Sequence, residues 1–373
     1  MRQPKVKTFV ITGGGTGGHI YPALAIARGL TERYPGCRIE YVGGYHGLET
    51  SIVPRAGLPL TKIHCRGLER RISWQAVRAL GETAWGLSEA LWLLRRRRPD
   101  LVIGTGGFVA LPVVMAATML GIPAVIHEQN AYPGITNRLL ASRVALVMLT
   151  FAEAAKRLKA RRTVLTGLPV RTEIMTAERQ AGRRFFQLPE KGQVILTVGG
   201  SRGAQRLNEA MPVVAQALAS LPDAYLVHVT GEPHLASVQA AYRQVGMDES
   251  RLRILPYLER MEQALAACDL CIGRAGAAFL AELTVRGLPS ILIPYPFAAE
   301  NHQEANARSL VDAGAARMIV DRELTGETLT PLVLELLREP ATLTAMGQAA
   351  LTLGKPTALT SIIDEIDQLL QKG

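Results

Sequence analysis

Cysteine is scarce in this sequence, which contains only Cys37, Cys65, Cys268 and Cys271 among 373 residues. So few and so scattered cysteines cannot cross-link a chain of this length, which excludes the small disulfide-rich secreted proteins and fits a reducing cytoplasm. Cys268 and Cys271 have the spacing of a redox or zinc motif, but no second cysteine pair or nearby His-x-x-x-His completes a metal set. We therefore interpret both side chains as core packing.

A secretory signal is also missing from the start of the sequence. MRQPKVKTFVIT places basic residues before a short apolar run, without the length or the small-residue cleavage site of such a signal. We therefore do not expect export. A length of 373 residues predicts two domains of comparable size, and the 48% hydrophobic and 20% charged shares are those of a globular protein.

Charge is absent from residues 101–126, a segment that by length alone would qualify as a membrane-spanning helix. Glycine and proline interrupt it at Gly104, Gly106, Gly107, Pro112, Gly121 and Pro123. They divide it into LVIG, a glycine turn, PVVMAATML and PAVIHE, which predicts the strand, loop, helix and strand of a buried α/β unit. A membrane span is therefore not predicted here.

Acidic residues are few in the first half of the chain. Residues 1–171 carry 24 Lys and Arg against 9 Asp and Glu, a net charge of +15, whereas residues 172–373 carry 18 against 23, a net charge of −5. This asymmetry indicates an anionic partner such as nucleic acid, phospholipid headgroups or a phosphorylated substrate. Because no RNA- or DNA-binding module is recognisable, nucleic acid is the weaker interpretation.

All three tryptophans lie in one arginine-rich segment, RGLERRISWQAVRALGETAWGLSEALWLLRRRRPD, at about helical spacing. This composition is typical of an interfacial helix on an anionic membrane, where tryptophans lie at the boundary and arginines contact headgroups. An ordinary helix that packs its apolar stripe on its own sheet has the same composition, and both interpretations hold if one or two apolar side chains stay exposed. The candidate membrane contacts are Trp74, Trp85, Trp92, Arg70, Arg71 and Arg78.

A glycine-rich loop that ends in a histidine, GGGTGGHIYP, follows the apolar run KVKTFVIT. The pattern predicts a strand, a tight turn and a helix whose free N–H groups favour phosphate or another anionic oxygen. Its spacing differs from the G-x-G-x-x-G of dinucleotide sites, because His19 ends the loop and Pro22 follows. A histidine at this place can remove a proton near neutral pH, or it can cap the loop with a hydrogen bond.

The same design recurs at about residue 193, where QVILTVGGSRGAQRLNEAMPVVAQAL again predicts strand, glycine loop and helix. Two doubly wound α/β domains follow from this repeat. Further on, RAGAAFLAELTVRGLP places Glu282 inside a short apolar helix whose start favours anions. A carboxylate there is suited to accept hydrogen bonds from ribose hydroxyls, and the apolar surroundings favour this role over that of a solvated charge.

Several motifs occur together between about residue 13 and residue 307: GGGTGGHIYPALAIA, GGFVALP, HEQNAYPGITNRLLA, TGLPVR, GGSRGAQRLN and the block from RAGAAFLAE to HQEANA. In this order they resemble the MurG family of N-acetylglucosaminyltransferases, which converts lipid I to lipid II in peptidoglycan synthesis. The joint resemblance is far more specific than any single glycine loop.

The resemblance implies a GT-B fold, with two Rossmann-like domains that face each other across a cleft. Residues 1–171 would form the N-terminal domain for the acceptor and the membrane, and residues 172–354 the domain that binds the UDP-sugar. A C-terminal helix, at about residues 355–373, would pack back on the first domain.

The implied reaction is an inverting transfer of N-acetylglucosamine from UDP-N-acetylglucosamine to the 4-hydroxyl of the muramyl unit of undecaprenyl-diphosphate-linked muramyl-pentapeptide. The implied location is the cytoplasmic face of the cell membrane, with peripheral attachment to an anionic surface. The reaction needs a base for the hydroxyl and stabilisation of the departing UDP.

The resemblance also assigns donor contacts residue by residue. Glu282 would bind the ribose and Gln303 the sugar, while Leu258 would pack at the uracil. The remaining implied contacts, near the transfer point, the diphosphate and the helix start, are Thr16, Gly17, Gly18, Asn130, Arg171, Ser201, Ala277, Ala278, Phe279, Leu280 and Ala281. Asn130 and Arg171 are expected to contact the donor from the N-terminal side.

His19 is the leading candidate for the general base or for positioning the acceptor. His127 and Glu128, in the HEQN motif, are its rivals. The chain has no Asp-x-Asp pair, so the metal-bridged diphosphate site of the other large nucleotide-sugar fold has no obvious ligands. We expect neither a required metal nor a cofactor, and we expect the helix start and Arg171 to meet the charge of the leaving group.

Three positions depart from the family pattern. Leu168 stands where asparagine is usual, Arg202 stands where glutamine is common, and the AAF run that ends at Phe279 lacks the usual hydroxyl residue. Backbone N–H groups would then hold the phosphate alone. These departures question the donor affinity more than the reaction.

Three alternatives remain. A GT-B transferase for another lipid acceptor, such as diacylglycerol, would share the donor block, but HEQN and the first glycine loop argue against it. A nicotinamide-dependent oxidoreductase would need G-x-G-x-x-G and an acidic residue about 20 positions on, where Glu40 is only loosely placed. A non-catalytic membrane-binding module would need no second glycine loop.

Overall fold

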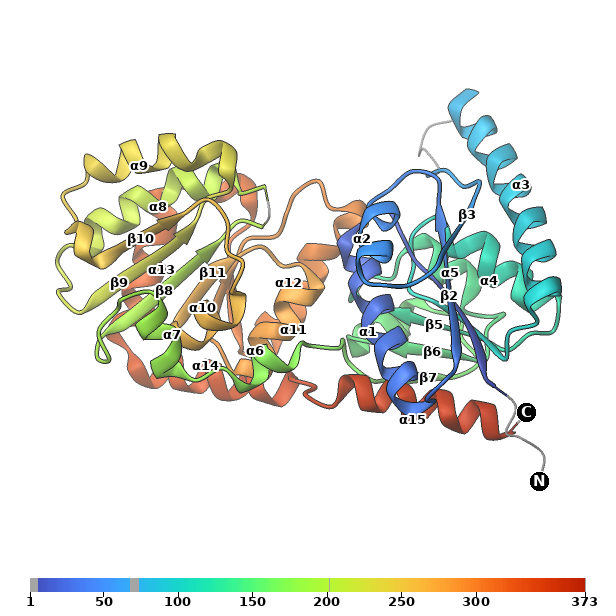
Figure 1. The fold of residues 1–373 in the computed structure, drawn as a ribbon. Helices are drawn as coiled ribbons and strands as arrows, with labels where there is room; N and C mark the ends of the chain where they lie inside the picture. The colour runs from blue at the N-terminus through green and yellow to red at the C-terminus, as the bar shows by residue number, and fades with distance from the viewer. Residues whose placement is uncertain (1–5, 68–73, 201, 373) are drawn as a thin grey trace. The chain divides into compact units, whose positions relative to one another are not determined.

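The computed structural model describes residues 6–67, 74–200 and 202–372 and divides into two compact units. Unit 1 comprises Met1–Pro169 and Thr357–Gly373, and unit 2 comprises Val170–Pro356. Each unit is built on one fully parallel sheet with helices on both faces (Figure 1). The prediction of an α/β protein with two doubly wound parallel sheets is therefore confirmed.

The sheet of unit 1 has seven strands in the order β3-β2-β1-β4-β5-β6-β7. These strands are β1 Thr8–Thr12, β2 Arg38–Gly44, β3 Leu60–Ile63, β4 Leu101–Gly104, β5 Ala124–Glu128, β6 Leu146–Leu149 and β7 Thr163–Leu165. The helices are α1 Gly17–Arg33, α2 Glu49–Arg55, α3 Trp74–Arg97, α4 Ala110–Met119, α5 Ile135–Leu140, the 3-10 helix η1 Ala152–Arg157 and α15 Ala358–Lys372. The strand order reverses between β1 and β4, which is where sheets of this type bind ligands.

The uncharged segment 101–126 forms β4, a glycine loop, α4 and the start of β5, as predicted. Its side chains are apolar because β4 and β5 lie inside the sheet and α4 is buried between the sheet and α3. Among the described residues, none of the helices combines the length and the hydropathy that a bilayer span requires.

The sheet of unit 2 has six strands in the order β10-β9-β8-β11-β12-β13, so that its order reverses between β8 and β11. These strands are β8 Gln193–Val198, β9 Ala224–Val229, β10 Leu252–Leu255, β11 Leu270–Gly273, β12 Ser290–Leu292 and β13 Ala316–Met318. The α-helices are α6 Thr172–Thr176, α7 Arg179–Phe185, α8 Gln205–Leu218, α9 Leu235–Arg243, α10 Met261–Ala267, α11 Ala277–Arg286, α12 His302–Asp312, α13 Gly326–Arg338 and α14 Pro340–Leu353. Short 3-10 helices are η2 Glu232–His234, η3 Glu249–Arg251, η4 Ala299–Asn301 and η5 Asp321–Glu323.

Cys268 is the C-cap of α10 and Cys271 lies within β11, with 2% and 0% of their surface exposed. Burial raises the pKa of the Cys268 thiol to about 12, so this side chain is an apolar neutral group at physiological pH. Their interpretation as core packing agrees with this burial.

The C-terminal helix α15 packs along α1 of unit 1 (Figure 1). Ile362, Ile363 and Ile366 of α15 belong to the same apolar cluster as the buried side chains of α1. The carboxylate of Asp367 accepts hydrogen bonds from the hydroxyl of Tyr34 and from Nε of Arg33, the latter at 2.5 Å. Apolar burial and a polar clamp together hold the last residues of the chain on the first sheet.

Candidate active site

The first glycine loop leaves the carboxyl end of β1 and runs into α1 beside the loop that follows β4. The N–H of Gly14 donates to the carbonyl of Gly106 at 3.3 Å, and the hydroxyl of Thr105 donates to the carbonyl of His19 at 2.8 Å. Gly107 has a φ of +81°, and a Cβ there would lie 2.3 Å from the carbonyl oxygen of Gly14. Only glycine permits so close an approach of the two loops.

A buried carboxylate that we did not predict from the sequence also binds this loop. Glu49, the first residue of α2, is 2% exposed and accepts hydrogen bonds from the N–H groups of Gly15 and Gly44, at 2.9 and 3.2 Å. The glycines around it leave room for its side chain, since a Cβ at Gly14 would lie 2.6 Å from a carboxylate oxygen of Glu49. The sequence feature that indicates Glu49 is the GLE run after the second strand, because an acidic residue is favoured at the start of a helix.

Of the loop residues predicted to lie near the transfer point, Thr16 and Gly18 are exposed, and Gly17 and His19 are half-buried. Thr16 is the N-cap of α1 and makes no side-chain cap hydrogen bond. His19 places its Nδ1 2.9 Å from Oε1 of Gln129, the residue that follows β5. The first turn of α1 therefore presents its hydroxyl, its backbone N–H groups and one imidazole at the strand reversal.

His127 is completely buried and both of its ring nitrogens are engaged. Nε2 is 2.9 Å from the carbonyl of Gly167 and Nδ1 is 3.1 Å from Nε2 of Gln129. Burial lowers the pKa of His127 to about 4. This ring is thus a neutral part of the core, with no face open to a substrate.

Glu128, 1% exposed, holds the turn that follows β5. Its Oε1 accepts from the backbone N–H of Asn130 at 2.9 Å, and its Oε2 accepts from the N–H of Gly134 at 3.1 Å and from Nδ2 of Asn137 at 2.8 Å. Both oxygens are therefore committed to the protein. The position of Asn130, a predicted donor contact, depends on this clamp.

In unit 2, Glu282 lies on α11 with its Oε1 3.6 Å from Nη2 of Arg171. Burial raises the pKa of Glu282 to about 6, although the guanidinium of Arg171 opposes that shift. We expected Arg171 on the N-terminal side. The structure places it in unit 2 instead, because it is the N-cap of α6, whose helix packs against α11.

The start of α11 points its free N–H groups at the carboxyl edge of the second sheet, next to the strand reversal. Gly276 is the N-cap, so no side chain caps the helix start. In the helix, Ala277 and Leu280 are buried, Phe279 and Ala281 are half-buried, and Ala278 is exposed. A Cβ at Gly273 would lie 3.0 Å from the ring of Phe279, so this departure from the family pattern packs against the preceding strand.

Gln303, on α12, is hydrogen-bonded to the loop that leads into α11. Its Oε1 accepts from the N–H groups of Ala275 and Tyr295, at 3.1 and 2.9 Å. Asn306, one turn further along, donates to the carbonyl of Ala275 at 3.2 Å. The amide oxygen of Gln303 is therefore used within the protein, and its amide N–H₂ is the group that would donate to a sugar.

The other predicted donor contacts are placed as follows. Leu258, in the loop between β10 and α10, is buried. Of the departures from the family pattern, Leu168 after β7 is buried and Arg202 is exposed. Ser201 lies outside the described residues, and so do Arg70 and Arg71. Among the residues that the structure describes, no three His, Cys, Asp or Glu side chains are grouped as metal ligands.

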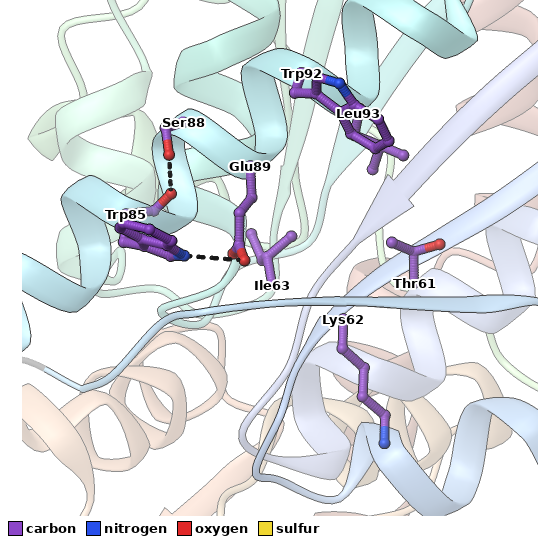
Figure 2. A pocket seen from close by; sticks show the side chains of 8 residues that line it. All are labelled: Thr61, Lys62, Ile63, Trp85, Ser88, Glu89, Trp92 and Leu93. Atoms are coloured by element: carbon purple, nitrogen blue, oxygen red, sulfur yellow. Dashed lines mark hydrogen bonds between the residues drawn. The ribbon is translucent and has the colours of Figure 1, made fainter.

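Helix α3 keeps two of its tryptophans on the surface. Trp85 and Trp92 are 62% and 61% exposed, while Ala90 and Leu94 pack into the apolar cluster of unit 1. A cleft of about 390 Å³ lies between α3 and β3, and Figure 2 shows both indoles among the side chains that line it. There Nε1 of Trp85 donates to Glu89 at 3.2 Å. The guanidinium of Arg96 lies 5.4 Å above the ring of Trp92. Trp74 and Arg78 lie on the same helix, but the structure does not describe their side chains.

Comparison with known proteins assigns both units to one family. The glycosyltransferase family 28 N-terminal domain matches residues 9–149, and the glycosyltransferase family 28 C-terminal domain matches residues 194–366. The chain therefore belongs to glycosyltransferase family 28 and is a hexosyltransferase.

Individual relatives agree. The UDP-N-acetylglucosamine–N-acetylmuramyl-(pentapeptide) pyrophosphoryl-undecaprenol N-acetylglucosamine transferases of Moorella thermoacetica and Desulforudis audaxviator are 51% and 49% identical, each over 98% of this chain and 99% of theirs. The crystal structure of Acinetobacter baumannii MurG is 31% identical and matches with a TM-score of 0.80 over 98% of this chain and 100% of that one. These matches confirm the resemblance to the MurG family.

The clamp made by Glu128 predicts a stability effect. We expect Glu128→Gln to lower the free energy of unfolding of unit 1 by about 1–3 kcal/mol, because the –NH2 group of the new amide would replace one of two accepting oxygens and would face N–H donors. All three tryptophans lie in unit 1, so urea denaturation followed by tryptophan fluorescence reports on this unit.

The matched control is Glu153→Gln, since Glu153 is an exposed carboxylate of unit 1, and it should shift unfolding by less than about 0.5 kcal/mol. A Glu128→Gln protein with wild-type stability would contradict the clamp.

Proposed function

We propose that this protein transfers N-acetylglucosamine from UDP-N-acetylglucosamine to the 4-hydroxyl of the muramyl unit of lipid I, which yields lipid II for peptidoglycan synthesis. The observation that carries the proposal is the similarity to relatives named for this transfer. They are 51% and 49% identical to this chain over 98% of its length. The candidate base, His19, is present in the first turn of α1, and the candidate ribose ligand, Glu282, is present on α11. A transferase for another lipid acceptor is not favoured.

In this proposal His19 is the general base. Its ring lies half-buried at the first turn of α1, where one nitrogen contacts Gln129. The imidazole would take the proton of the acceptor hydroxyl while the oxygen attacks the anomeric carbon and the bond to UDP breaks. His127 and Glu128 would instead act as structural residues, because their polar atoms are bonded within the core.

The donor would be held mainly by unit 2. Glu282 would accept hydrogen bonds from the ribose hydroxyls, and the N–H groups at the start of α11 would bind the diphosphate. Arg171, whose side chain is 56% exposed, would neutralise the charge that develops on UDP. This arrangement makes Arg171 and Glu282 neighbours that act on the same nucleotide.

Transfer itself is the first test. Purified protein incubated with labelled UDP-N-acetylglucosamine and a lipid I analogue should form the labelled disaccharide lipid. His19→Ala should reduce kcat by about 10²–10⁴-fold while the KM for the donor changes little, because the base acts in the transition state.

Two outcomes would reject the assignment. If folded wild-type protein forms no product with the lipid I analogue but glycosylates diacylglycerol, the acceptor is wrong. If His19→Ala keeps full turnover, His19 is not the base.

Glu282 predicts a pH dependence of donor binding. Its pKa of about 6 means that the carboxylate is protonated below that pH and then accepts fewer hydrogen bonds. The affinity for UDP-N-acetylglucosamine should therefore fall as the pH drops through about 6, as titration calorimetry would measure. Glu282→Gln should bind about 10- to 100-fold more weakly at pH 7.5 and should lose this dependence.

Glu259→Gln is the control for this measurement, since Glu259 is an exposed carboxylate of the same unit. It should retain the wild-type affinity and pH profile. A Glu282→Gln protein that keeps the affinity would remove Glu282 from the donor site.

We also propose that α3 attaches the protein peripherally to the cytoplasmic face of an anionic membrane. Its support is the exposure of Trp85 and Trp92 next to a C-terminal turn that carries Arg95, Arg96 and Arg97. Indoles favour the boundary between headgroups and acyl chains, and guanidinium groups favour anionic headgroups. Leu87, Ala90, Leu91, Leu93 and Leu94 of the helix pack on unit 1, so that membrane contact needs no unfolding.

Vesicle flotation tests this attachment. Wild-type protein should float with phosphatidylglycerol-containing vesicles, and the double variant Trp85→Ala/Trp92→Ala should bind several-fold less because it loses two interfacial anchors. Phe185→Ala, which removes an exposed aromatic ring of unit 2, should bind like the wild type. Equal binding to neutral and anionic vesicles would contradict the proposal.

A further inference from the structure

A continuous chain of hydrogen bonds links the first glycine loop to the interior of unit 1. It runs from the carbonyl of Gly167 to Nε2 of His127 at 2.9 Å, then from Nδ1 of His127 to Nε2 of Gln129 at 3.1 Å. The last link joins Oε1 of Gln129 to Nδ1 of His19 at 2.9 Å. Gln129 is 2% exposed and His127 is 0% exposed, so water does not compete for these inner links.

Two backbone carbonyls determine the direction of every bond in this chain. A carbonyl oxygen only accepts, so His127 carries its proton on Nε2 towards Gly167, and its Nδ1 is an acceptor. The amide nitrogen of Gln129 lies 2.8 Å from the carbonyl of His127, where only a donor fits. This contact orients the amide, so that its oxygen faces His19.

We propose that Gln129, oriented by His127, is a positioning residue that holds His19 in the tautomer with its proton on Nδ1 and its lone pair on Nε2. The amide oxygen of Gln129 cannot donate, so the Nδ1 of His19 has to be the donor of their hydrogen bond. The basic nitrogen is then the one that does not face the core. This inference rests on the proposed role of His19 as the base.

The amide of Gln129 can orient the ring of His19 without the negative charge that a carboxylate would add. In the proposed reaction the acceptor hydroxyl loses its proton to Nε2 of His19, its oxygen bonds to the anomeric carbon, and the electron pair of the broken bond leaves with UDP. The proton on Nδ1 stays in place throughout. The carbonyl of Gln129 orients the ring and solvates the imidazolium, but it adds no negative charge that would keep the base protonated beforehand.

Titratable groups on the neighbouring elements are few and are themselves bonded. On β5 they are His127, whose pKa is lowered to about 4 by burial, and Glu128, whose oxygens hold the following turn. On α2 the carboxylate of Glu49 is bonded to Gly15, and on β2 the hydroxyl of Tyr41 donates to Gly13 at 2.6 Å. Among the described residues, the side chain of Gln129 forms a hydrogen bond with the imidazole of His19.

Nitrogen NMR of the histidine rings tests the tautomer without any substrate. Long-range ¹H–¹⁵N spectra of histidine-labelled protein, assigned with His19→Asn and His127→Asn, should show a protonated Nδ1 for His19 and a protonated Nε2 for His127 above pH 7. In Gln129→Met the His19 signals should move towards a mixture of tautomers. A wild-type His19 protonated on Nε2 would overturn the proposal.

Kinetics test the consequence. Gln129→Met should lower kcat by about 10- to 100-fold while the donor KM stays within about twofold, as for loss of a residue that orients a catalytic group. Gln129→Glu keeps an acceptor for His19 but loses the donor to the carbonyl of His127, so it should recover only part of the kcat lost in Gln129→Met. Its negative charge should stabilise the protonated ring of His19 and move the acid limb of the pH–rate profile up by about one pH unit. Gln193→Met in unit 2 loses a comparable amide bond, to the carbonyl of Leu337, and should leave both readouts unchanged.

The two proposals fail in different ways. Full turnover by His19→Ala would reject the base, whatever the NMR spectra show. An inactive His19→Ala together with a Gln129→Met protein that keeps the wild-type kcat and tautomer would retain the base and reject Gln129 as its positioning residue. If Gln129→Met does not fold, as tryptophan fluorescence would reveal, the wild-type tautomer and the pH profile of Gln129→Glu still decide.

Discussion

The parallel pairing of β4 with β1 on one side and with β5 on the other is the constraint on which the candidate active site depends. Thr12 is in register with Gly104, and Gly104 with Ile126, so all three strands end at the same edge of the sheet. The glycine loop, the loop after β4 and the HEQN segment emerge there side by side. Contacts between residues more than 100 positions apart, such as His19 and Gln129, follow from this register.

Much of the fold could be predicted from the sequence because glycine and proline mark the ends of its elements. The breakers between residues 101 and 126 divided an uncharged run into β4, α4 and β5, where hydropathy alone suggested a membrane span. The two strand-loop-helix repeats likewise predicted two sheets, since a buried parallel strand needs a continuous apolar run. The family resemblance then supplied the identity of the substrates, which no local pattern contains.

Other features could not be predicted because they depend on which backbone groups a side chain meets. Burial of His127 against Gly167 removes a histidine that motif reasoning treated as a rival base. Gln129 belongs to the same motif, but the sequence does not show its proposed role. That role depends on the carbonyl groups of Gly167 and His127, which orient the ring of His127 and the amide of Gln129. Arg171 is ambiguous in sequence, because it stands at the junction of the units, and only the packing of α6 on α11 assigns it to the second.

The return of the chain to its first unit has a consequence for synthesis on the ribosome. Gly29 of α1 leaves a slot for α15, since a Cβ there would lie 2.9 Å from Leu359. Ile362, Ile363 and Ile366 fill the same cluster, yet they are translated only after all of unit 2. Unit 2 is complete in sequence before that slot can close. The nascent N-terminal unit must therefore wait, with part of its core open to water, while the second unit is made, and a chain that stalls near residue 356 would expose this apolar surface to chaperones or proteases.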